Sequence, residues 1–127
     1  MSITTATETT YNPAPGTEYV YVLSDYGRAA ARALGPGWGA ESGFLGAWAL
    51  IFYTEEPEGS RLGGQSLRLF VDAEGDLCVE IHNDVTPMAE RHCIPTDELP
   101  DFAPRDPEAL GLWGTAIAAA IRRHYVA

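Results

Sequence analysis

The sequence predicts an α+β fold in which a three-stranded antiparallel meander carries an N-terminal and a C-terminal helix on one face, in the order α-β-β-β-α. Three observations carry this prediction. Residues 67–83 form two alternating runs around a glycine-containing turn, residues 41–54 form an apolar stretch, and helical patterns occupy both ends of residues 17–127. The chain of 127 residues has the length of one domain, and residues 1–16 are predicted to be a flexible tail outside it.

The first element, residues 17–34, is interpreted as an amphipathic helix because its apolar residues recur at spacings of three and four. Thr17 is the expected cap, and Gly35-Pro36 ends the helix. Alternatively, residues 19–23 form a short strand, since valine and tyrosine favour strands, and the helix starts at Ser24 or Asp25. Both interpretations are open at this point.

Residues 41–54 are apolar on both alternating faces, so they are predicted to form one long strand. Gly43 and Gly46 would allow a bulge or close packing within it. Trp38, in the tight connection before this strand, is expected to fill one end of the core. Residues 55–64 then form a solvated loop that leads to the hairpin.

The hairpin of residues 67–83 has a register that follows from its turn. If Asp72 opposes Asp76 and Gly75 takes the left-handed conformation, the strands pair in one fixed order. The predicted pairs are Val71–Leu77, Phe70–Cys78, Leu69–Val79, Arg68–Glu80, Leu67–Ile81 and Ser66–His82. One face is then wholly apolar and receives the helices. A slip of one residue would set apolar side chains opposite polar ones, so the pattern favours a single register.

The last third of the chain starts with residues 84–105, whose four prolines exclude long regular structure. Asp106-Pro107 is a typical helix start, with an aspartate cap and proline at the first helical position. Gly111 and Gly114 weaken a helix, so their presence indicates close approach of another element.

Charge is the strongest compositional signal, with 18 acidic residues against 8 basic ones and a formal net charge of −10. Such a chain repels phosphate, so direct nucleic-acid binding and membrane binding are not expected. The N-terminus lacks the regions of a signal peptide, and a cytoplasmic location is predicted. Cys78 and Cys93 are expected there as reduced thiols, although the sequence leaves a single bridge open.

No metal site, cofactor or catalytic set is predicted. Cys78, His82, His92 and Cys93 carry metal-ligating atoms, but the first two lie about 13 Å apart along a strand. Neighbouring residues such as His92 and Cys93 point apart, which also argues against a thiol nucleophile with its base. Glu80 faces Arg68 and is interpreted as its ion-pair partner. A non-enzymatic protein is therefore the leading interpretation.

The acidic residues have an informative layout. In a meander, the loop after the first strand and the chain leaving the hairpin lie at the same end of the sheet, opposite the hairpin turn. That end is expected to gather Glu55, Glu56, Glu58 and Asp84. If the proline-rich segment stays nearby, Asp97, Glu98 and Asp101 would join them. Such a concentration of acids would attract a basic surface.

The solvent-facing side of the hairpin, with an aromatic residue among charged ones, resembles an interface patch. It comprises Arg68, Phe70, Cys78, Glu80 and His82. We therefore expect a small acidic protein that binds a protein partner with a basic surface. The alternatives are an anti-defence or nucleic-acid-mimic inhibitor, a ligand-binding protein or enzyme with an aromatic pocket near Trp38, Trp48, Trp113 and Tyr53, and a homodimer formed through residues 44–53 or this hairpin side.

The segments ALGPGW at residues 33–38 and VDAEGDLCVE at residues 71–80, together with the absence of lysine, resemble small accessory proteins of actinobacteria and their phages or plasmids. This resemblance implies a bacterial or mobile-element origin. It assigns neither an activity nor a site.

Overall fold

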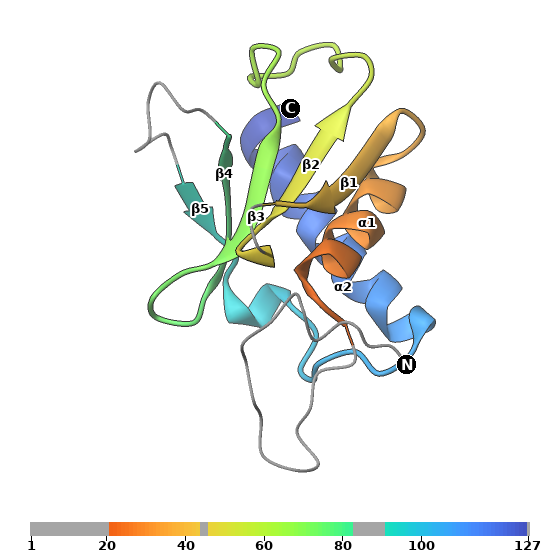
Figure 1. Cartoon of the computed structure of the whole chain (residues 1–127), viewed down its shortest axis with the longest axis vertical. Helices are drawn as coiled ribbons and strands as arrows, with labels where there is room; N and C mark the ends of the chain where they lie inside the picture. The colour runs from red at the N-terminus through yellow and green to blue at the C-terminus, as the bar shows by residue number, and fades with distance from the viewer. Residues whose placement is uncertain (1–20, 44–45, 83–90, 127) are drawn as a thin grey trace.

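The computed structural model describes residues 21–43, 46–82 and 91–126, and places both α-helices on one face of an antiparallel sheet of order β1-β2-β3-β4-β5 (Figure 1). In chain order the elements are α1 (Leu23–Leu34), β1 (Trp38–Ser42), β2 (Ala49–Tyr53), β3 (Leu67–Val71), β4 (Leu77–Ile81), β5 (Arg91–Cys93), the 3-10 helix η3 (Thr96–Glu98), α2 (Pro107–Ile121) and the π-helical turn η4 (Arg122–Val126). The α+β class is confirmed. The prediction of three strands is wrong, because the described residues form five.

The predicted long strand over residues 41–54 is replaced by the hairpin of β1 and β2, in which Ser42 pairs with Ala49. The chain reverses between Gly43, whose N–H donates to the carbonyl of Trp48 at 2.8 Å, and Gly46, which has a φ of +75°. A Cβ on Gly43 would lie 1.9 Å from the Trp48 indole nitrogen, so a larger residue there would require the Trp48 side chain to move. The glycines therefore make a turn rather than a bulge.

The hairpin of β3 and β4 has the predicted register, from Leu67 opposite Ile81 to Val71 opposite Leu77. Gly75 has the predicted left-handed conformation, with a φ of +87°. Of the inner-face residues, Leu67, Leu69 and Val79 are fully buried. Val71, at the turn end, is 51% exposed, so the helices do not cover the whole apolar face as predicted.

Helix α1 starts at Leu23, six residues later than the single-helix interpretation. Val22 is extended, and its N–H donates to the Asp25 carboxylate at 3.0 Å, which fixes the start. Gly35 ends the helix as predicted, with a φ of +117° and its N–H bonded to the Ala31 carbonyl at 3.1 Å. The strand alternative at residues 19–23 is wrong for its described part, because residues 21 and 22 belong to no strand and Leu23 is already helical. Residues 19 and 20, the predicted cap Thr17 and the tail of residues 1–16 lie outside the described residues.

Helix α2 starts as predicted, because Asp106 accepts a hydrogen bond from the Ala109 N–H at 2.8 Å. A Cβ on Gly114 would lie 2.5 Å from the carbonyl carbon and oxygen of Ala29 in α1. The predicted close approach is therefore confirmed for Gly114. For Gly111 it is not seen among the described residues, since none of their atoms outside the surrounding helix backbone lies within 4 Å of the corresponding position.

The core lies between the sheet and the two helices. It consists of Ala30, Ala49, Ile51, Leu62, Leu67, Leu69, Val79, Ile94, Ile117, Ala120, Ile121 and Tyr125. Trp38 packs against its edge, edge-to-face with Tyr53 at 5.3 Å. Buried Tyr125 donates its hydroxyl to the Val79 carbonyl at 3.2 Å, which ties η4 to β4. Among the described helices, none has the length and apolar character needed to cross a membrane.

Candidate functional site

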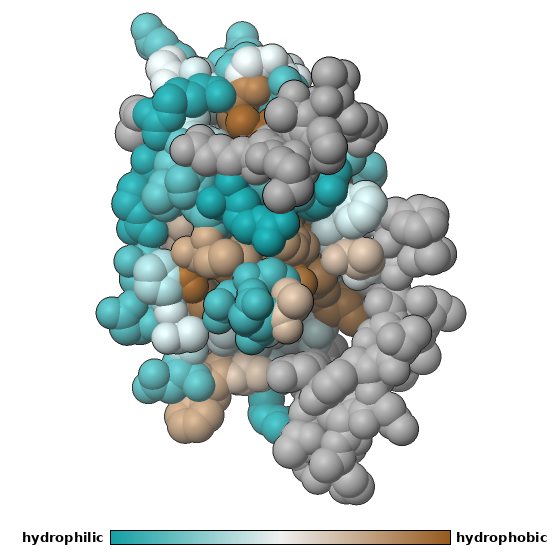
Figure 2. Space-filling model, turned by 90° about the vertical axis from the view of Figure 1, so that its left-hand side faces the viewer, coloured by the Kyte–Doolittle hydropathy of each residue, from teal (hydrophilic) through white to brown (hydrophobic). Residues whose placement is uncertain are grey.

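The sheet face opposite the helices, called the outer face below, is the candidate functional site, since no described helix lies over it (Figure 1). Strand alternation and the pairing register place its residues. They are Glu41, Trp48, Leu50, Phe52, Arg68, Phe70, Cys78, Glu80, His82, Arg91 and Cys93. Figure 2, which views the molecule from the side of β4 and β5, shows apolar residues exposed between hydrophilic ones. The face thus combines apolar and charged groups.

A buried carboxylate lies at the centre of the outer face. Glu80 is 6% exposed and stands directly between Arg68 on β3 and Arg91 on β5. Its Oε2 lies 3.4 Å from Arg68 Nη1, and its Oε1 lies 3.7 Å from Arg91 Nε. The predicted Arg68–Glu80 pair is confirmed. Two guanidinium groups compensate a charge that would be costly to bury alone.

The same arginines cover aromatic rings. The Arg68 guanidinium lies 4.5 Å from the centre of the Trp48 ring, and that of Arg91 lies 4.9 Å from the centre of the Phe70 ring. Arg68 Nη2 also lies 2.5 Å from His82 Nδ1. These contacts order a surface patch of rings and paired charges, and they bring together the predicted Arg68, Phe70, Glu80 and His82.

The acidic loop residues Glu55, Glu56 and Glu58 are exposed between β2 and β3. Figure 1 shows this loop at the end of the sheet opposite the β3–β4 turn, as the meander predicts. Asp84 lies outside the described residues. Helix η3, which carries Asp97 and Glu98, follows β5 in the chain. Glu98 pairs with Arg123 at 2.8 Å, and the Arg123 carbonyl accepts a hydrogen bond from Arg61 of the β2–β3 loop at 3.2 Å. Glu98 is therefore connected to this loop through Arg123.

Glu56 differs from its acidic neighbours because it holds the loop together. Its Oε2 accepts hydrogen bonds from Ser60 Oγ at 2.5 Å and from the Gly63 N–H at 3.0 Å. Burial, reinforced by the negative charge of Glu56, raises the pKa of Tyr53, whose hydroxyl donates to the Gln65 carbonyl at 3.1 Å. Glu55 and Glu58 are therefore the acids to vary when the charge of the loop is tested.

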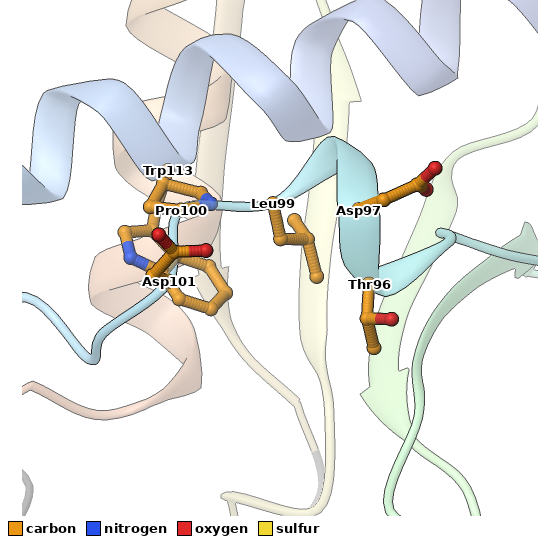
Figure 3. A pocket seen from close by; sticks show the side chains of 6 residues that line it. All are labelled: Thr96, Asp97, Leu99, Pro100, Asp101 and Trp113. Carbon is orange, nitrogen blue, oxygen red and sulfur yellow. The ribbon is translucent and has the colours of Figure 1, made fainter.

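The aromatic residues of the predicted ligand pocket do not converge. Trp38 packs on Tyr53, Trp48 lies under Arg68, and Trp113 contacts Tyr26 edge-to-face at 5.4 Å. Trp113 lines an open hollow of about 460 Å³, shown in Figure 3. Its other lining residues are Thr96, Asp97, Leu99, Pro100 and Asp101. Within the described residues, the hollow lined by Trp113 does not include Trp38, Trp48 or Tyr53.

The cysteines depart from the sequence prediction. Cys78 on β4 and Cys93 on β5 are directly opposite one another and form a disulfide. The expectation of reduced thiols is wrong because the proline-rich segment contains a short strand that the pattern did not predict. His92 points to the other face and stacks on His124 with ring centres 3.7 Å apart. The prediction that His92 and Cys93 point apart is therefore confirmed.

Sequence reasoning missed Trp48 and Arg91 as parts of the outer face. Trp48 was placed within a continuous strand, and Arg91 belongs to a strand of three residues that shows no readable alternation. Comparisons with protein-family models, curated proteins and solved structures found no significant match. The site is accordingly defined by the geometry of its residues.

Proposed function

We propose that this chain is a non-enzymatic protein-interaction protein that binds a basic protein partner through its outer face. The observation that carries the proposal is the Arg68–Glu80–Arg91 row, whose guanidinium groups order Trp48 and Phe70 on the sheet face opposite the helices. Aromatic and arginine side chains held in this way are typical of residues that dominate binding energy.

Charge supports a basic partner. The chain has a formal net charge of −10. Exposed acids flank both ends of the outer face, with Glu55 and Glu58 in the β2–β3 loop and Glu74 and Asp76 in the β3–β4 turn. Such a distribution accelerates encounter with a positively charged surface and weakens as salt screens it. The aromatic centre then supplies contacts that are insensitive to salt.

The experiment compares three variants with the parent protein as bait, followed by affinity measurements on the purified partner. Phe70→Ala removes a ring from the outer face, and Phe102→Ala is the matched control because its ring is 84% exposed and lies on the chain between η3 and α2. A double reversal, Glu55→Arg with Glu58→Arg, tests charge while preserving the Glu56 hydrogen bonds.

We expect Phe70→Ala to weaken binding at least about tenfold, as for an interface residue whose truncation costs more than about 1.4 kcal/mol. Phe102→Ala should leave affinity unchanged, and the charge reversal should lower the association rate and its salt dependence. An equal loss of affinity in Phe70→Ala and Phe102→Ala contradicts the proposal. So does the failure to find a partner whose binding is weakened by Phe70→Ala. Self-association that Phe70→Ala abolishes in light scattering would assign the face to a second copy instead.

A further inference from the structure

The turn end of the outer face brings a carboxylate against the disulfide. Asp72 follows β3, and its Oδ2 lies 3.6 Å from the Sγ of Cys78 and 3.6 Å from the Sγ of Cys93. The three ligand atoms all lie within 4.8 Å of one another. They come from three segments: the end of β3, β4 and β5. Only the fold assembles them, since Asp72 lies 6 residues from Cys78 and 21 residues from Cys93 in the sequence.

The Asp72 carboxylate is held in place by its other oxygen. Oδ1 accepts hydrogen bonds from the backbone N–H of Glu74 at 3.0 Å and of Asp76 at 2.9 Å, so the β3–β4 turn fixes the side chain. Oδ2 is thereby directed at the two sulfur atoms. A disulfide has no proton to donate, so the bridge gives this oxygen no hydrogen bond. A thiol or a cation in the same place would satisfy it.

We propose that reduction of the Cys78–Cys93 bridge creates a zinc site whose protein ligands are Cys78 Sγ, Cys93 Sγ and Asp72 Oδ2. Two thiolates and one carboxylate form a donor set that suits Zn²⁺, and the fourth tetrahedral position is open to water. Without metal, the reduced site holds two neutral thiols beside the Asp72 carboxylate, with the three ligand atoms within 4.8 Å of one another. When Zn²⁺ binds, the thiols lose their protons, and the divalent charge offsets the repulsion among two thiolates and one carboxylate.

The chemistry balances with an external dithiol or phosphine as the reductant. Two electrons from the reductant cleave the S–S bond, and two protons convert the sulfurs to thiols while the reductant is oxidised. Zinc binding then displaces one proton from each thiol, so two protons leave for each ion bound. Cys93 is exposed and Cys78 is buried, so reductant and metal approach from the Cys93 side. The bridge and the ion use the same sulfurs and exclude one another.

The test uses the full chain and needs no partner, so its outcome is independent of the proposed function. Oxidised and phosphine-reduced protein are titrated anaerobically with Co²⁺, whose thiolate charge-transfer bands report cysteine ligation, and bound Co²⁺ is then displaced with Zn²⁺. Asp72→Asn removes the charge but retains an oxygen for the turn. Asp76→Asn is the matched control, because its carboxylate is outside the ligand group.

We expect the reduced protein to bind one ion per chain with charge-transfer bands, and the oxidised protein to show none. Asp72→Asn should weaken zinc at least about tenfold, Cys93→Ser should abolish the bands, and Asp76→Asn should bind like the parent. Zinc should also raise the melting temperature of the reduced parent but not of the oxidised one. Equal metal binding in both redox states, absence of the bands after reduction, or unchanged affinity in Asp72→Asn overturns the proposal.

Discussion

Replacing Gly114 by alanine should destabilise the protein because two helices meet there with no room for a side chain. The new Cβ would lie 2.5 Å from the carbonyl carbon and oxygen of Ala29 and 2.7 Å from its Cβ. Helix α1 cannot simply retreat, since a Cβ at Gly27 on its other side would already be 3.0 Å from Ala49 on β2. Overpacking of this kind costs about 1–3 kcal/mol, and the better helix propensity of alanine returns about 1 kcal/mol. Because the clash is with backbone, we expect a net loss of about 2 kcal/mol.

The matched control is Gly111→Ala in the same helix, where no described atom outside the surrounding helix backbone lies within 4 Å of the added carbon. This variant should gain about 0.5–1 kcal/mol from propensity alone. Urea denaturation followed by circular dichroism measures the free energy of unfolding of the two variants. In thermal denaturation, the Gly114 variant should melt about 8 °C below the parent. If Gly114→Ala is as stable as the parent, or if both variants shift in the same direction, the proposed contact between α1 and α2 is refuted.

Three further variants test other parts of the fold. Glu80→Ala should cost about 2 kcal/mol in urea denaturation, since it leaves Arg68 and Arg91 without their shared counterion, whereas alanine at exposed Glu41 should change stability by less than about 0.5 kcal/mol. Asp106→Ala should cost about 1 kcal/mol in the same assay through loss of the α2 cap, and a smaller change would contradict the capping role. Burial raises the pKa of Tyr53, so the neutral hydroxyl stabilises the folded protein at pH values below the pKa of tyrosine in the unfolded chain. This stabilisation is lost as the pH rises through the pKa of Tyr53 in the folded protein. Tyr53→Phe should therefore remove this loss of stability at alkaline pH, as measured by melting curves.

The β3–β4 hairpin could be predicted from the sequence because every determinant of its register is local. Gly75 supplies the left-handed residue of the turn, and the alternation on either side allows one pairing only. The α2 start was predictable for the same reason, since Asp106 acts within three residues of itself. Elements specified by neighbours along the chain are the ones that pattern reasoning finds.

The β1–β2 hairpin escaped prediction because residues 43–53, which run from the end of β1 to the end of β2, form one uninterrupted apolar stretch directly after Glu41 and Ser42. Alternation continues through Gly43 and Gly46 without a polar break, so the period is equally compatible with one strand or two. The structure has two strands, with Ser42 paired to Ala49 and the Gly43 N–H bonded to the Trp48 carbonyl at 2.8 Å, and these contacts exist only after the chain has reversed. The disulfide is similar, since Cys93 reaches Cys78 only through a strand of three residues.

The sequence predicts the Arg68–Glu80 pair but not the burial of Glu80, which is 6% exposed. The burial changes what the pair contributes to the outer face. As an exposed pair it would contribute tenths of a kcal/mol and leave the neighbouring rings free. The second cation, Arg91, changes this, because it closes the other side of the carboxylate and covers Phe70 at the same time. Arg91, which lies on the three-residue strand β5, therefore completes the contacts of Glu80 and Phe70 on the outer face.

The disulfide and Phe70, the residue that we propose contacts a partner, share one row of the sheet, since Phe70 opposes Cys78 and Cys78 opposes Cys93. A partner seated over Phe70 would therefore meet the exposed Cys93. If both proposals hold, the two binding equilibria are linked: the factor by which zinc changes partner affinity must equal the factor by which the partner changes zinc affinity. Measuring the affinity for the partner with and without zinc, and the affinity for zinc with and without the partner, in the reduced protein tests this equality. A partner whose affinity is the same with and without zinc would place its contact on the Trp48 side of Glu80, away from the sulfur atoms.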